Sequence, residues 1–171
     1  MRIYLIGFMG SGKSTLGSSV APVFKVPFID TDHEIETMAG KTIQDIFTSH
    51  GEGYFRNVEK QVLHQTSNFN KAIVATGGGL PCFDDNMQWI NKNGISIYLQ
   101  WPPGILKRNV LSQRLKRPLL ASLSEREAEI IITELLDLRI PYYEQAAITI
   151  EMTGDQEIDE TILIKACKYI W

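Results

Sequence analysis

The sequence has little of what several common classes of protein require. It carries only two cysteines, Cys82 and Cys167, which lack CxxC spacing and cannot form a disulfide framework. Its three histidines are scattered along the chain and indicate no metal site. We therefore expect free thiols in a reducing compartment and a cytoplasmic location.

Long hydrophobic runs are also absent. The longest, such as Ile3–Ile6 and Ile130–Ile132, are far too short to span a bilayer, so we expect no membrane partner. The first residues lack the charged, apolar and small-residue progression of a signal peptide. A net charge of −3 argues against binding to nucleic acid through bulk electrostatics, although it leaves room for a local basic pocket.

What the chain does have is the composition of one folded domain. It has 171 residues and an apolar fraction of 44%, which is enough for a full hydrophobic core. No repeat, low-complexity tract or Pro/Gly/Ser-rich linker divides it. We therefore expect a single domain over residues 1–171, with a monomer as the default for this size.

Short apolar segments alternate with segments of helical character. We predict strands at Arg2–Ile6, Val26–Ile29, Ala72–Ala75, Ile95–Leu99 and Ile148–Met152. We predict helices at about 14–20, in three pieces up to residue 68, and at 84–91, 103–111, 124–146 and 158–169. This alternation implies an α/β fold with a parallel sheet covered on both faces, in which ligands bind beyond the carboxyl ends of the strands.

The residues after the first predicted strand match a phosphate-binding loop (P-loop). Gly7–Ser14 satisfies G-x-x-x-x-G-K-[ST], and it lies between a strand and a helix, as the motif requires, which a chance Gly-rich turn would not. The glycines let backbone N–H groups surround phosphate oxygens. Lys13 can reach the β- and γ-phosphates, and the Ser14 hydroxyl can ligate Mg²⁺. The predicted ATP contacts in this loop are Gly10, Ser11, Gly12, Lys13, Ser14 and Thr15.

Nucleotide binding alone does not establish catalysis, because GTPase switches and ATP-driven assembly factors also carry this loop. The guanine-reading sequence N-K-x-D is absent. Asp30 and Asp32 follow the second predicted strand, and in extended chain residues two apart point the same way, so both carboxylates are expected to face the P-loop. One can organise Mg²⁺ through water, and the other can orient or deprotonate an acceptor hydroxyl.

Two further motifs are weak in isolation. Arg56 is followed three residues later by Glu59, a spacing most often found in surface ion pairs. Gly77–Gly79 directly follows a predicted buried strand, where glycine is costly unless a ligand must approach the backbone closely.

Together these motifs resemble the shikimate kinase family, from Ile3 to about Thr153. Apart from the P-loop each signal is weak or moderate, but their order and spacing are jointly very specific. The six signals are Gly7–Ser14, Asp30-Thr31-Asp32, Gly51-Glu52 with Phe55-Arg56, Gly77–Gly79, Arg117-Pro118-Leu119-Leu120, and Arg139 with Tyr143. The resemblance implies a three-layer α/β/α P-loop kinase fold like that of nucleoside monophosphate kinases, with a five-stranded parallel sheet. Its core would be 1–30, 60–111 and 124–171, with a substrate-binding insert at 31–59 and a mobile lid at 112–123.

The resemblance also implies an activity, the ATP-dependent phosphorylation of the 3-hydroxyl of shikimate in the aromatic amino acid pathway. The partners would be ATP and shikimate, and the cofactor would be Mg²⁺. By the same resemblance, Asp32 contacts the shikimate hydroxyls and is the base, while Asp30, through water, and Ser14 support Mg²⁺.

The remaining roles that the resemblance implies concern arginines and one glycine. Arg56 and Arg139 would hold the shikimate carboxylate, and Gly78 would offer its backbone to the substrate. Arg117 would reach the ATP phosphates from the lid and, with Lys13, act in catalysis. Elementary chemistry agrees, because planar bidentate guanidinium groups suit a carboxylate and an acceptor hydroxyl calls for a carboxylate base.

One departure from the family and two alternatives stay open. Near the end of the last strand, where the family often places a polar or basic residue against adenine, Met152–Gln156 contains no arginine, so no adenine contact is assigned. Gluconate is also an anionic polyol, so a gluconate kinase is one alternative. A catalytically silent ATP-binding module is the other, although it would be expected to lack Asp32 or Arg117.

Overall fold

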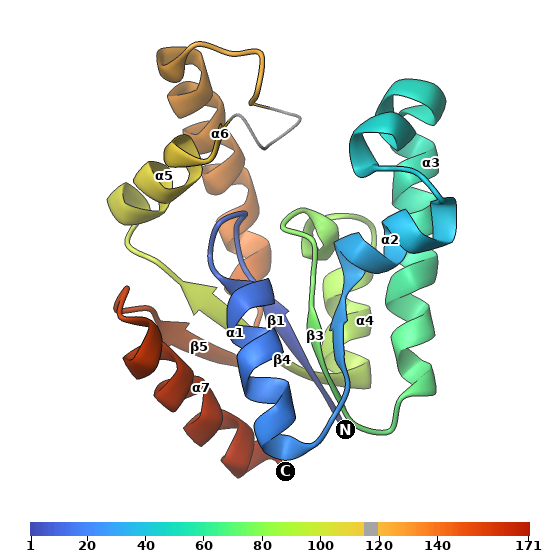
Figure 1. Ribbon diagram of the computed structural model, residues 1–171, viewed down its shortest axis with the longest axis vertical. Coiled ribbons are helices and arrows are strands. Elements are labelled where there is room, and N and C mark those ends of the chain that lie inside the picture. Colours follow the sequence, from blue (N-terminus) through green and yellow to red (C-terminus); the bar gives the residue numbers. More distant parts are fainter. Residues whose placement is uncertain (115–119) are drawn as a thin grey trace.

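The computed structural model describes residues 1–114 and 120–171, and its sheet agrees with the predicted alternation. Five parallel strands lie in the order β2-β3-β1-β4-β5. They are β1 (Arg2–Ile6), β2 (Phe28–Asp30), β3 (Ala72–Ala75), β4 (Gly94–Gln100) and β5 (Ile148–Glu151). Because β1 is the central strand, the loop that follows it opens at the middle of the carboxyl edge (Figure 1).

Helices cover both faces of the sheet and make three layers. They are α1 (Lys13–Val20), α2 (Thr31–Ala39), α3 (Ile43–Gln65), α4 (Asn86–Asn93), α5 (Pro103–Ser112), α6 (Glu125–Tyr143) and α7 (Gln156–Ile170). Side chains alternate along β1, so Tyr4 and Ile6 enter the core under α4, α5 and α6, whereas Ile3 and Leu5 enter the core under α1 and α7. Short 3₁₀ turns are also present at Ala21–Phe24, Thr66–Asn68 and Leu80–Cys82.

Helix α2 and the first half of α3 project beyond the sheet, as Figure 1 shows, with a small core of their own. That core consists of Ile35, Ile46, Phe55, Val58 and Val62. The expected three helical pieces are present: Gly40 ends α2 with φ 62°, and Gly51, with φ 78°, interrupts α3. Thr42 begins α3 by accepting a hydrogen bond from the Asp45 N–H at 3.1 Å.

Most predicted boundaries agree with the structure, and one strand is displaced. β1 and β3 have the predicted bounds, and Ser124 with Glu127 forms the capping box that begins α6. β2 runs from Phe28 to Asp30 rather than over Val26–Ile29. Its ladder begins only after Pro27, which has no N–H to donate, although the Pro27 carbonyl accepts a bond from Ile73. In the described part of the chain, no helix combines the length and apolarity needed to cross a membrane.

Candidate active site

The P-loop closes tightly around the end of β1. Gly7 has φ 143°, and a Cβ there would lie 3.1 Å from both the Leu99 carbonyl and the Ser11 hydroxyl. Gly12 precedes α1 in the left-handed conformation with φ 84°. Both positions therefore require glycine. The consequence is a compact turn that brings backbone N–H groups and the N-terminus of α1 to one point.

Lys13 folds back over this turn. Its ammonium donates to the carbonyls of Gly7 and Phe8 at 2.9 and 2.8 Å, and to the Ser11 hydroxyl at 3.2 Å. Only 7% of Lys13 is exposed. The positive charge is thus held at the mouth of the loop, where the β- and γ-phosphates of a nucleotide would lie.

Asp30 links the P-loop helix to the acceptor side. One carboxylate oxygen accepts from the Ser14 hydroxyl at 2.5 Å, and the other accepts from the Asp32 N–H at 3.0 Å. The second bond caps α2, which begins at Thr31. The expectation that Asp30 and Asp32 lie in one extended segment was therefore wrong, since Asp32 is in the first turn of a helix. Both carboxylates nevertheless line the same cavity.

That cavity, of about 310 Å³, lies over the P-loop. Its walls include Lys13, Ser14, Thr15, Asp30 and Asp32, together with Gly78 from the segment after β3. A second cavity of about 350 Å³ lies between this segment and the projecting helices. Met9, Asp32 and Gly78 line both cavities. A group bound in one cavity can therefore meet a group bound in the other beside Asp32.

Asp32 is unusual for an aspartate because its surroundings disfavour the charged form. Burial and the nearby charge of Asp30 raise its pKa to about 6, and the cations of Lys13 and Arg56 oppose the rise only in part. A carboxyl group with a pKa close to neutrality is well suited to accept a proton and later release it.

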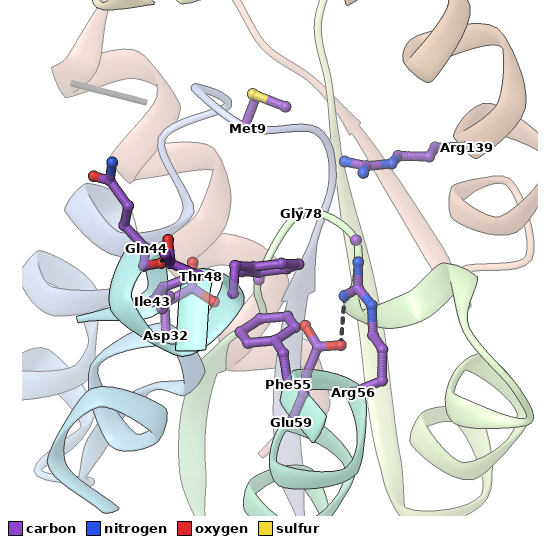
Figure 2. A pocket seen from close by; sticks show the side chains of 13 residues that line it. Met9, Asp32, Ile43, Gln44, Thr48, Phe55, Arg56, Glu59, Gly78 and Arg139 are labelled. Atoms are coloured by element: carbon purple, nitrogen blue, oxygen red, sulfur yellow. Dashed lines mark hydrogen bonds and ion pairs between the residues drawn. The ribbon is translucent and has the colours of Figure 1, made fainter. Parts of the chain in front are cut away.

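The second cavity has one apolar and one cationic side, as Figure 2 shows. Ile43, Phe47 and Phe55 form the apolar side. Arg56 and Arg139 point in from the other side, next to the glycine segment. A Cβ on Gly79 would lie 3.3 Å from an Arg56 nitrogen and 3.5 Å from an Arg139 nitrogen. The two guanidinium groups thus converge, which is the arrangement that a carboxylate ligand requires.

Two glutamates orient Arg56. Glu59 accepts from its Nη1 at 2.7 Å, and Glu52 accepts from Nε and Nη2 at 3.2 and 3.1 Å. The guanidinium also lies 3.5 Å from the centre of the Phe83 ring. Glu59 is 1% exposed, and burial raises its pKa to about 7 in spite of Arg56. The pair is therefore part of the pocket rather than a surface ion pair.

The geometry describes a small phosphotransferase site, and sequence comparison identifies its family. The shikimate kinase family model matches residues 9–169. The chain belongs to the shikimate kinase family. A curated shikimate kinase from Bacteroides thetaiotaomicron is 40% identical over 146 residues, which are 85% of this chain and 83% of that protein.

Solved structures of family members have the same fold. A shikimate kinase from Bacteroides thetaiotaomicron superposes with a TM-score of 0.89 at 36% identity, covering 98% of both chains. The shikimate kinase from Acinetobacter baumannii, solved in complex with shikimate, gives a TM-score of 0.86 at 34% identity over 98% of this chain and 93% of that one. The protein is thus a kinase with the three-layer P-loop fold predicted from its sequence.

Of the predicted site residues that the structure describes, all but Ser11 line one or both cavities, whereas Ser11 is fully buried within the P-loop. The structure also adds other residues to the site. Arg117 lies outside the described residues. Sequence reasoning missed Glu59 as a pocket residue and the apolar side formed by Ile43 and Phe47. The i,i+4 spacing of Ile43 and Phe47 was a usable signal for an apolar stripe, but not for one that faces a ligand.

Proposed function

We propose that this protein transfers the γ-phosphoryl group of ATP to the 3-hydroxyl of shikimate, giving shikimate 3-phosphate and ADP. The observation that carries the proposal is the junction of two cavities at Asp32, one over the P-loop and one beside paired guanidinium groups. A kinase has to place a phosphoryl donor and a hydroxyl acceptor in line, and catalysis is mostly positioning and charge stabilisation.

The nucleotide phosphates occupy the cavity over the P-loop. Backbone N–H groups of the loop and the N-terminus of α1 bind their oxygens, and Lys13 neutralises charge on the transferring group. The residues that serve ATP are Gly10, Ser11, Gly12, Lys13, Ser14 and Thr15. Arg117, by family resemblance, reaches the phosphates from a lid over 112–123.

Mg²⁺ fits the oxygens at the foot of this cavity. The Ser14 hydroxyl and the Asp30 carboxylate lie 2.5 Å apart, and both are hard oxygen ligands, with Asp30 acting through water. Among the residues described, no cluster of three or more His, Cys, Asp or Glu side chains could hold a metal alone. The phosphates therefore have to complete the shell, as is usual for Mg²⁺ in kinases. When bound, the ion would neutralise charge on the β- and γ-phosphates.

Shikimate occupies the second cavity. Arg56 and Arg139 bind its carboxylate together with the backbone of Gly78, and its ring lies against the apolar side formed by Phe47 and Phe55. Asp32 then faces the hydroxyl groups and takes the proton of the attacking one. This arrangement explains why a carboxylate with a raised pKa lies between the two cavities.

A coupled assay that follows ADP release tests the proposal. With Mg²⁺ and ATP, we expect turnover with shikimate and little with gluconate or quinate. Turnover with gluconate alone would establish the rival sugar-acid kinase. Nucleotide binding without turnover of any hydroxy acid would establish the silent module. The same preparation also tests, by sedimentation, the expected monomer.

A further inference from the structure

The three glycines after β3 have all their carbonyl groups occupied. The Gly77 carbonyl accepts from the Leu80 N–H at 3.1 Å, and the Gly79 carbonyl accepts from the Cys82 N–H at 2.9 Å. The Gly78 carbonyl accepts from the Tyr143 hydroxyl at 2.5 Å. Only this last bond comes from a distant side chain, so it is the one that ties the glycine segment to α6.

The backbone N–H groups of the same three glycines differ in whether they have an acceptor within the protein. That of Gly77 donates to the Thr31 hydroxyl at 2.8 Å. Those of Gly78 and Gly79 have no hydrogen-bond acceptor among residues 1–114 and 120–171. Both glycines line the acceptor cavity. Donors without a protein acceptor beside two guanidinium groups are available to an anion.

The surroundings of Tyr143 keep its hydroxyl protonated, so that it acts as a hydrogen-bond donor. The residue is fully buried, and its ring packs against Tyr98 with the ring centres 5.3 Å apart. Burial raises the pKa of its hydroxyl well above the usual range, so the proton stays on the oxygen. Tyr143 lies one helical turn after Arg139, so α6 contributes to the acceptor pocket at two points.

We propose that Tyr143 is a positioning residue for the acceptor carboxylate. In a trans peptide, the carbonyl of one residue and the N–H of the next point in opposite directions. By holding the Gly78 carbonyl toward α6, the Tyr143 hydroxyl keeps the Gly79 N–H turned the other way, and Gly79 itself lies where Arg56 and Arg139 converge. The inference rests on the proposed function, because it concerns how the same pocket selects a carboxylate.

Tyr143→Phe removes the hydroxyl and keeps the ring. The Gly78 carbonyl then loses its partner, and the peptide can turn. Losing one well-oriented hydrogen bond in the ligand site is worth roughly tenfold in affinity. We expect the KM for shikimate to rise about tenfold, the kcat to stay within about threefold, and the KM for ATP to be unchanged.

Tyr4→Phe is the matched control. Tyr4 is also fully buried, and its hydroxyl bonds to the Thr66 hydroxyl at 2.8 Å, at the opposite end of β1 from the P-loop. Both variants lose one buried tyrosine hydrogen bond, so both should lose thermal stability. Only Tyr143→Phe should change the KM for shikimate.

A second acceptor separates positioning from general damage. The carboxamide of shikimate keeps the hydroxyls and lacks the negative charge, so the parent protein should strongly prefer shikimate. In Tyr143→Phe, the ratio of kcat/KM for shikimate to that for the carboxamide should fall about tenfold. A ratio equal to that of the parent protein, with both values lowered alike, would overturn the inference.

A measurement on the parent protein avoids dependence on folding of the variant. In ¹H–¹⁵N spectra, the amide resonance of Gly79 should move on addition of shikimate and move less on addition of its carboxamide, whose neutral carbonyl is a weaker acceptor. An unchanged Gly79 resonance at saturating shikimate would contradict the inference. No turnover of shikimate by the parent protein overturns the proposed function and the inference together, whereas turnover with an unaltered KM in Tyr143→Phe overturns the inference alone.

Discussion

The indole N–H of Trp101 donates a 3.0 Å hydrogen bond to the main-chain carbonyl of Ser11, and so joins the end of β4 to the P-loop. The same ring faces Gly154, where a Cβ would lie 3.5 Å away. Buried Asp159 holds this turn by accepting from the N–H groups of Thr153 and Gly154 at 2.8 and 3.2 Å. The P-loop is therefore supported from the ends of both β4 and β5.

Trp101→Phe should weaken nucleotide binding selectively. The substitution keeps an aromatic ring and removes the bond to Ser11, which is worth about 1 kcal/mol. We expect the KM for ATP to rise about fivefold and the KM for the acceptor to be unchanged. Trp89→Phe, in α4 against Tyr4 and His64, is the control for loss of a packed indole. An unaltered KM for ATP in Trp101→Phe would show that the loop does not need this support.

Lys13→Ala should lower turnover by several orders of magnitude. The ammonium stabilises charge on the transferring phosphoryl group more in the transition state than in the ground state. The variant also loses three bonds within the loop, so circular dichroism should first establish that it is folded. Lys13→Arg keeps the charge without the geometry and should be intermediate. Activity within a few-fold of the parent protein would contradict the P-loop assignment.

Asp32 and Arg56 should affect different kinetic constants. Asp32→Asn keeps the shape and loses the base, so the kcat should fall by about 10²–10⁴. Arg56→Lys keeps the charge and loses the planar fork, so the KM for the acceptor should rise about tenfold to a hundredfold. Lys60→Ala, which removes an exposed pair with Asp85, serves as the neutral control. Effects of both changes on the KM for ATP alone would contradict this division of roles.

The stability of the empty protein should depend on pH through Asp32 and Glu59. Burial raises their pKa values to about 6 and 7, whereas unfolded carboxyl groups ionise near about 4. As pH rises from about 4 to 7, the unfolded chain releases these protons first, so their contribution to the free energy of unfolding falls. The loss is complete once the pH exceeds the folded pKa values.

Urea unfolding at pH 5, 6, 7 and 8 measures this dependence. Glu59→Gln should flatten the curve between pH 5 and 7 relative to the parent protein, because the amide does not titrate. Glu134→Gln, on the exposed side of α6, is the control for replacing a glutamate by glutamine at a solvent-exposed position. Identical slopes for Glu59→Gln and the parent protein would rule out Glu59 as the source.

The proposed lid concerns Arg117, and hydrogen exchange tests it. If 112–123 closes over the nucleotide, its amides should gain protection in the ternary complex with shikimate and a non-hydrolysable ATP analogue. Arg117→Ala should lower turnover far more than thermal stability. Arg126→Ala, an exposed arginine at the start of α6, is the matched control. Unaltered exchange together with near-normal activity would leave the lid without support.

The sequence predicted those features of the structure that depend on a few neighbouring residues. The P-loop, the capping box at Ser124 and the break at Gly51 each require particular residue types at particular spacings, and each is present. The extended conformation expected for Asp30-Thr31-Asp32 was wrong, because one hydrogen bond decides where α2 begins. The Asp30 carboxylate accepts from the Asp32 N–H and begins a helix where an extended chain was expected.

The properties of the acceptor pocket could not be predicted from the sequence, because they come from tertiary packing. The spacing of Arg56 and Glu59 is the same on a surface and in a cavity, and only the placement of α3 against the sheet buries Glu59. Likewise, nothing in the order of residues joins Tyr143 to Gly78, which are 65 positions apart. Family resemblance supplied the roles of Arg56 and Arg139, but not the groups that hold them in place.

The convergence of Arg56 and Arg139 beside Gly79 also bears on how this protein would respond to selection in the laboratory. The two like charges repel one another in the empty protein, where Arg56 is paired with Glu52 and Glu59 but Arg139 has no ion pair among the described residues. A screen for heat resistance run on the empty protein would therefore reward loss of Arg139, whereas loss of Arg56 would leave buried Glu59 without its partner. Variants found in that way would be more thermostable but would fail as catalysts. A search for more thermostable variants therefore has to be carried out with shikimate or an analogue bound.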